Sequence, residues 1–208
     1  YFVDKTLMIR DLIENHAMVT LFTRPRRFGK TLNQFMIRRF FEDEITEKGE
    51  KVDNGYLFDG LAITRCGEEI MQHQQRYPVI FMSLKSAKQD SYDMAYASLI
   101  DEISKEFKRH AYLLQGESLS PKEKQEFQLV MDKEAQPIAY AKALGFLSEC
   151  LTKYHGHKTI ILIDEYDSPL QHSWRTPHHE ACTSIYREVF AILKADDKYE
   201  KFVFITGI

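Results

Sequence analysis

Short apolar runs alternate along the chain with longer stretches in which apolar residues recur every three or four positions. The runs at 18–23, 79–84 and 202–206 are rich in β-branched and aromatic residues and too short for helices, so they predict strands. The run at 159–163 is apolar along its length, as a strand buried on both faces must be.

Helical spacing fills the stretches between these runs. It predicts helices over 30–41, 92–107, 144–154 and 185–192, and His155-Gly156-His157 is a stop signal for the third of them. The charged stretch from Glu42 to Asp53 predicts a solvated connection. The polar segment 115–137, which contains Gly116, Pro121 and Pro137, predicts a mobile insertion with a short helix.

Strands that alternate with helices predict an α/β fold of three layers with a mostly parallel sheet. In such sheets ligands bind beyond the carboxyl ends of the strands. The residues that directly follow each strand are therefore the candidates for function.

A basic, glycine-containing segment follows the first strand. The pattern of a phosphate loop is Gly, four residues, then Gly-Lys-Ser/Thr between a strand and a helix, and Gly29-Lys30-Thr31 matches its second half. Gly29 would let the backbone approach phosphate oxygens, Lys30 could reach the β- and γ-phosphates, and the Thr31 hydroxyl could ligate Mg²⁺. Arg24 replaces the first glycine, and Pro25 favours extended geometry there. A basic turn before an amphipathic helix is the alternative. The predicted nucleotide-binding residues are Arg26, Arg27, Phe28, Gly29, Lys30, Thr31 and Leu32.

Two carboxylates, Asp164 and Glu165, directly follow the buried strand. Asp164 would hold Mg²⁺, because hard oxygen ligands suit that ion, and Glu165 would orient the attacking water. An ordinary acidic loop is the alternative for this pair alone. The two motifs together, in this order, favour a nucleoside-triphosphatase site.

Composition narrows the class of protein. The 208 residues suggest one domain or one and a half, and 44% hydrophobic residues exclude a disordered chain. A net charge of −3 excludes a global basic field for nucleic acid, and no apolar run is long enough to span a membrane. The three widely spaced cysteines indicate reduced thiols in the cytoplasm. The chain lacks the Asn-Lys-x-Asp string of guanine-selective enzymes, which favours ATP.

Four strings together resemble the AAA-ATPase-like family of bacterial proteins over the whole of residues 1–208. They are Tyr1-Phe2-Val3-Asp4-Lys5-Thr6, Arg24-Pro25-Arg26-Arg27-Phe28-Gly29-Lys30-Thr31, Asp164-Glu165-Tyr166-Asp167-Ser168-Pro169-Leu170 and Phe204-Ile205-Thr206-Gly207. The resemblance implies a P-loop NTPase core with an additional strand, 202–206, between the Walker A and Walker B strands. It also implies that Thr206 senses the γ-phosphate, and that a PD-(D/E)XK nuclease-like domain follows the ATPase module in the parent protein.

We therefore expect a Mg²⁺-dependent ATP-binding and hydrolysing module that acts as a nucleotide-driven switch. Glu165, Lys30 and Thr206 would be catalytic, and Thr31 and Asp164 would hold the metal. A regulatory scaffold with little turnover, and an ATP-regulating module of a nucleic-acid-cleaving protein, stay open. We also expect this chain to be a core that stops after the sensor strand of a longer protein.

The roles of Arg26 and Arg27 stay open at this point. They could reach phosphate oxygens, present charge to a partner or nucleic acid, or pair with the acidic Glu42-Asp43-Glu44. An arginine acting in trans would need an oligomer. The other basic clusters, Arg38-Arg39 and Lys105-Lys108-Arg109, are predicted to be solvated helix faces.

Overall fold

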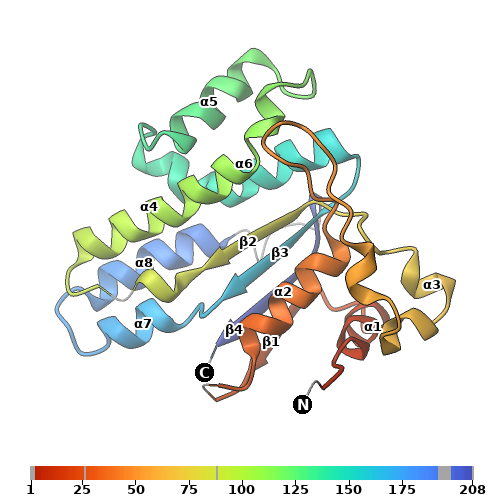
Figure 1. Cartoon of the computed structure of the whole chain (residues 1–208). Helices are drawn as coiled ribbons and strands as arrows, with labels where there is room; N and C mark the ends of the chain where they lie inside the picture. The colour runs from red at the N-terminus through yellow and green to blue at the C-terminus, as the bar shows by residue number, and fades with distance from the viewer. Residues whose placement is uncertain (1–2, 26, 88, 192–197, 208) are drawn as a thin grey trace.

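The computed structural model describes residues 3–25, 27–87, 89–191 and 198–207. Within these ranges one parallel sheet has the strand order β1-β4-β3-β2 (Figure 1). Its strands are β1 Val19–Thr23, β2 Val79–Ser83, β3 Thr159–Asp164 and β4 Glu200–Gly207. The prediction of an α/β fold with a parallel sheet is confirmed, and β4 pairs with β1 on one side and with β3 on the other.

Helices cover both faces of this sheet (Figure 1). The helices on the first face are α1 Leu7–Glu14, α2 Lys30–Phe41 and α3 Glu68–Met71, with the 3₁₀ turns Gly55–Phe58 and Ala62–Arg65. Those on the second face are α4 Tyr92–Arg109, α5 Pro121–Met131, α6 Pro137–His155, α7 Ser168–Ser173 and α8 His179–Val189, with the 3₁₀ turns Leu84–Ala87 and Ala111–Leu114.

The position of β3 between two layers of helices explains why its sequence shows no alternation of apolar and polar residues. Ile160 and Leu162 lie in the core beneath α1 and α2, whereas Ile161 and Ile163 lie in the core beneath α4 and α6. All four side chains are fully buried, because successive residues of a strand point to opposite faces and both faces are covered.

Several elements begin or end where the sequence predicts. α2 spans the predicted residues 30–41, and α6 ends at His155, followed by Gly156 with a positive φ of 68°. The left-handed conformation at Gly156 explains the stop signal, because glycine adopts it without a Cβ clash. The short helix predicted within the insertion 115–137 is α5, whose Phe127 and Val130 lie in the core. The last predicted helix ends at Val189 within the described range, and Ile192 lies outside it.

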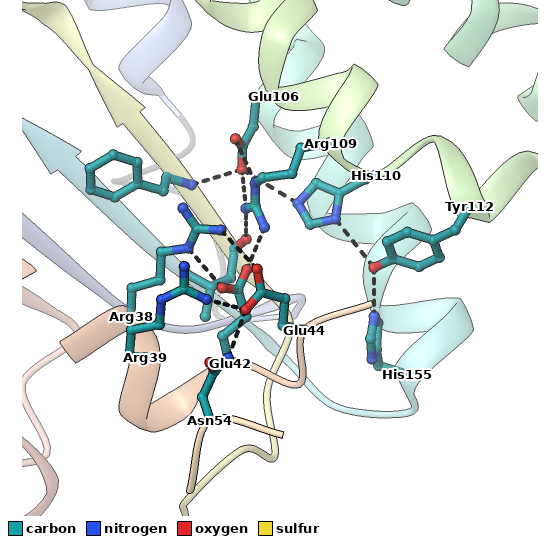
Figure 2. A network of polar contacts seen from close by, with 12 residues as sticks. Arg38, Arg39, Glu42, Glu44, Asn54, Glu106, Arg109, His110, Tyr112 and His155 are labelled. Carbon is teal, nitrogen blue, oxygen red and sulfur yellow. Dashed lines mark hydrogen bonds and ion pairs between the residues drawn. The ribbon is translucent and has the colours of Figure 1, made fainter. Parts of the chain in front are cut away.

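The prediction that Glu42 to Asp53 is a solvated connection is wrong at its start. Glu42 is only 1% exposed, and its carboxylate pairs with Arg38 of α2 and Arg109 of α4 (Figure 2). Arg38 and Arg109 are therefore not solvated, contrary to expectation, since their side chains are 11% and 24% exposed. Burial of one carboxylate against two guanidinium groups keeps all three charges paired.

The paired charges of α4 also cover the outer edge of β2. Pro78 accepts a hydrogen bond from β3, so Val79 and Phe81 direct their backbone polar groups away from β3. Glu106 accepts a hydrogen bond from the Phe81 amide at 2.8 Å, and Arg109 donates to the Val79 carbonyl. Side chains thus occupy positions that a further strand would otherwise pair with.

Candidate functional site

The loop between β1 and α2 is shaped by two residues with positive φ. Gly29, the residue before the first turn of α2, has φ 72°, and Arg27 has φ 70°. This conformation is natural for glycine but strained for arginine, and such strain is concentrated at functional sites. The first amides of α2, from Lys30 onward, lack carbonyl partners within the helix and so favour an anion.

Lys30 lies inside this loop. Its ammonium donates hydrogen bonds to the carbonyls of Arg24 at 2.6 Å and Pro25 at 3.1 Å, and the residue is 8% exposed. Arg24, which replaces the first glycine of the pattern, turns its guanidinium back onto the Thr23 carbonyl and the Phe22 ring. The long side chain of Arg24 therefore does not occupy the interior of the loop.

Three elements meet at the carboxylate of Asp164, the last residue of β3. Thr31 at the start of α2 donates its hydroxyl to Oδ2 at 2.7 Å, and Thr206 near the end of β4 donates to Oδ1 at 2.5 Å. Asp164 is 2% exposed and Thr206 is fully buried. The structure thus joins residues that lie 133 and 42 positions apart in the sequence.

Glu165 follows with a positive φ of 52°. Its amide donates to the Thr206 hydroxyl at 3.4 Å, and its carboxylate accepts a hydrogen bond from Ser168 at 3.0 Å. The backbone turn separates its carboxylate from that of Asp164, so the two acids face different partners. Such a division suits one metal-binding carboxylate and one that orients water.

The remaining predicted nucleotide-binding residues lie at the surface of the loop and of α2. Phe28 is 58% exposed and Leu32 is 72% exposed. Arg26 lies outside the described residues. None of the described ion pairs joins Arg27 to the acidic residues 42–44. The partners of those acidic residues are Arg38, Arg39, Arg109, Lys51 and His155.

Comparison with known families agrees with this arrangement. A family model described as a predicted AAA-ATPase matches residues 1–208. The chain belongs to the AAA-ATPase-like family. Membership of this family implies nucleotide binding.

One curated relative of this AAA-ATPase-like chain is an "Uncharacterized protein in vnfD 5'region" of Azotobacter chroococcum mcd 1. The two are 26% identical over 217 residues, which include all of this chain and 34% of the relative. The chain thus spans about a third of the length of that relative. No solved structure matches the chain.

The donor set at Asp164 fits Mg²⁺. Thr31 and Asp164 supply a hydroxyl and a carboxylate oxygen in direct contact, and both are the hard ligands that this ion prefers. The described residues hold no cluster of three or more His, Cys, Asp or Glu side chains that could bind a metal. A bound Mg²⁺ would therefore take its other ligands from phosphate oxygens and water, as it usually does.

Three residues near the site of this AAA-ATPase-like chain were not predicted. Gln34 of α2 is fully buried and donates to the Ile163 carbonyl at 2.8 Å, which fixes α2 against β3. Ser168 holds the Glu165 carboxylate, and Gly207 packs against Tyr166 and Asp167. The string from Asp164 to Leu170 offered a signal for Ser168, but helical spacing gives none for a buried glutamine.

Within the described ranges no helix is long and apolar enough to cross a membrane. The three cysteines, Cys66, Cys150 and Cys182, are free thiols.

Proposed function

We propose that this chain binds and hydrolyses ATP with Mg²⁺ and changes conformation with the state of the nucleotide. The observation that carries the proposal is the shared carboxylate of Asp164, which accepts hydrogen bonds from both Thr31 and Thr206. These contacts tie the start of α2 and the end of β4 to one group. A ligand that displaces either hydroxyl therefore acts on both elements.

Each residue has a physical role in this proposal. The amides that begin α2 and the Lys30 ammonium would bind phosphate oxygens, and Lys30 would exchange the carbonyls of Arg24 and Pro25 for them. Thr31 and Asp164 would hold Mg²⁺, which neutralises phosphate charge when bound. Arg27 would add positive charge at the rim of the loop.

Two residues would act on the transferred phosphoryl group. Glu165, held by Ser168, would orient the attacking water and accept its proton at the carboxylate. Thr206 would sense the γ-phosphate and transmit its presence through Asp164 and the Glu165 amide. Within this scheme β4 is the additional strand of a P-loop NTPase core, a role supported by its pairing with both β1 and β3.

The proposal also covers the cellular location of the chain and a domain that it would control. A cytoplasmic location is supported by the free thiols, since that compartment keeps cysteines reduced. Control of a nuclease-like domain in a longer protein is supported only by the family resemblance.

The direct test compares Lys30→Ala and Glu165→Gln with the unaltered 208-residue chain. We expect Lys30→Ala to abolish ATP binding in calorimetry, because the loop loses its internal cation. Glu165→Gln should bind ATP normally but release phosphate roughly 100-fold more slowly, the usual effect of losing a general base. Glu126→Gln, an exposed change on α5, is the matched control and should alter neither measurement.

The outcomes separate the candidate functions. An unaltered chain that binds no ATP would contradict the proposal as a whole. Binding without phosphate release would support a regulatory scaffold instead, and equal rates for Glu165→Gln and the unaltered chain would exclude Glu165 as the base.

A further inference from the structure

The turn before α1 is fixed to a distant part of the chain. The Asp4 carboxylate accepts hydrogen bonds from the Thr6 amide at 2.8 Å, the Thr6 hydroxyl at 2.6 Å and the Ala62 amide at 2.7 Å. The Thr6 hydroxyl accepts in turn from the Ile63 amide at 3.1 Å. Hydrogen bonds from Thr6 and Ala62 also lower the pKa of Asp4, so the carboxylate stays ionised in this turn. Lys5 lies between the two anchored residues.

The side chain of Lys5 reaches the phosphate loop. A methyl group placed on Gly29 would lie 4.0 Å from Lys5 Nζ, and no other described atom outside the neighbouring residues and α2 lies that close to it. Lys5 is exposed, and no ion pair among the described residues involves it. A cation without an ion-pair partner among the described residues thus lies near Gly29, where the backbone can approach an anion most closely.

Lys5 differs in this respect from Lys30 and Arg24, whose charged groups bond to backbone carbonyls. The ammonium of Lys30 is bonded to two loop carbonyls, and the guanidinium of Arg24 is turned onto the Thr23 carbonyl. Lys5 instead approaches from a separate segment, ahead of β1. An anion that settles on the amides of Gly29 and Lys30 would lie beneath the Lys5 ammonium.

We propose that Lys5 is a second phosphate-binding cation of this site and contacts the polyphosphate of the nucleotide above Gly29. This inference rests on the proposed function, because it assigns a further residue to the same ligand. An ammonium–phosphate hydrogen bond is charge-assisted, and its loss weakens binding by roughly 10- to 100-fold.

The test measures the affinity of Lys5→Met for ADP and for inorganic pyrophosphate, both with Mg²⁺, by calorimetry. Pyrophosphate has no base or ribose, so it isolates contacts to phosphate. We expect Lys5→Met to weaken both ligands at least about 10-fold and to reduce the salt dependence of binding. Lys5→Arg, which keeps the charge, should restore most of the affinity. Lys122→Met, an exposed lysine of α5, is the matched control and should bind both ligands normally.

Three results would overturn the assignment or locate its failure. Unchanged affinities for Lys5→Met, with binding lost in Lys30→Ala, would show that Lys5 has no part in the site. A loss for ADP but not for pyrophosphate would assign Lys5 to the base or ribose instead. An unaltered chain that binds neither ligand would refute the proposed function itself. Lys5→Gln provides a second neutral variant. If Lys5→Met is poorly folded, the affinities of Lys5→Gln for ADP and pyrophosphate decide whether Lys5 binds phosphate.

Discussion

At the scale of single residues, the site depends on how closely β4 can approach the turn after β3. Gly207 is the last residue of β4, and a Cβ at this position would lie 2.7 Å from Tyr166 Cε1 and 3.0 Å from Asp167 Oδ1. The neighbouring Thr206 carbonyl accepts a hydrogen bond from the Tyr166 amide at 3.1 Å. The absence of a side chain at Gly207 thus lets Thr206 reach Asp164.

Gly207→Ala tests this close approach. We expect it to lower the free energy of unfolding by about 1–3 kcal/mol, the usual effect of forcing an extra carbon into a packed site. It should also slow phosphate release, because Thr206 would move away from Asp164. Urea unfolding and a phosphate-release assay check both effects. Gly116→Ala is the control, since its nearest contact would be an ordinary 3.5 Å to Tyr154. Equal stability of the two variants would contradict this reading of Gly207.

At the scale of secondary-structure elements, side chains of α4 bond to the backbone at the outer edge of β2, where the sheet has no further strand among the described residues. Glu106 and Arg109 bond to the outer edge of β2, and Arg109 also pairs with Glu42 after α2 (Figure 2). Burial alone would raise the pKa of Glu42, but the charges of Arg109 and Arg38 outweigh it and lower the pKa. The network therefore joins α2 to α4 through paired ions, and α4 to β2 through hydrogen bonds to its backbone, at the end of α2 farthest from Lys30.

Arg109→Met tests the contribution of this network. Removing the guanidinium leaves Glu42 and Glu106 buried without one of their cations, so we expect a loss of about 3–5 kcal/mol in the free energy of unfolding. The melting temperature should fall by roughly 6–20 °C. Lys105→Met, on the same helix, is the control because its pair with Glu102 is exposed and should contribute at most about 1 kcal/mol. Similar melting temperatures for both variants would contradict the buried network.

At the scale of the whole molecule, the same network contributes to the dependence of stability on pH. His110 is 3% exposed and faces the Glu106 carboxylate at 3.4 Å and the Tyr112 hydroxyl at 3.2 Å. Burial, followed by the charge of Arg109, lowers the pKa of His110 to about 4. Between pH 6.5 and 4 the unfolded chain therefore takes up a proton at this residue that the folded protein does not.

Stability should consequently fall as the pH drops from 6.5 towards 4, by on the order of 3 kcal/mol for a pKa lowered from 6.5 to about 4. His110→Gln cannot take up this proton, so its stability should vary less over the same window. Urea unfolding at pH 7.5, 6 and 5 measures the difference in slope. The exposed His172→Gln should keep the slope of the unaltered chain. Parallel slopes for all three proteins would refute the role of His110.

The sequence by itself determined most of the elements and the pairing of motifs. Periodicity depends on neighbours within a few positions, so α2, α6 and β3 could be predicted from local spacing. The meeting of the start of α2 with Asp164 could also be predicted, because the carboxyl ends of parallel strands lie at one edge of a sheet. α1 and the short helices α3 and α7 were not predicted, since few positions carry their pattern.

Only the tertiary structure decided which charges are buried and which distant segments reach the site. The sequence predicts Glu42 in a solvated connection and Arg109 on a solvated helix face, yet the two residues pair across 67 positions. Lys5 lies before the first strand, yet it comes close to Gly29, and the residues on either side of it bond to the turn at Ala62 and Ile63. Burial and contact of this kind depend on the packing of elements that are far apart in the chain, and the local spacing of residues cannot predict that packing.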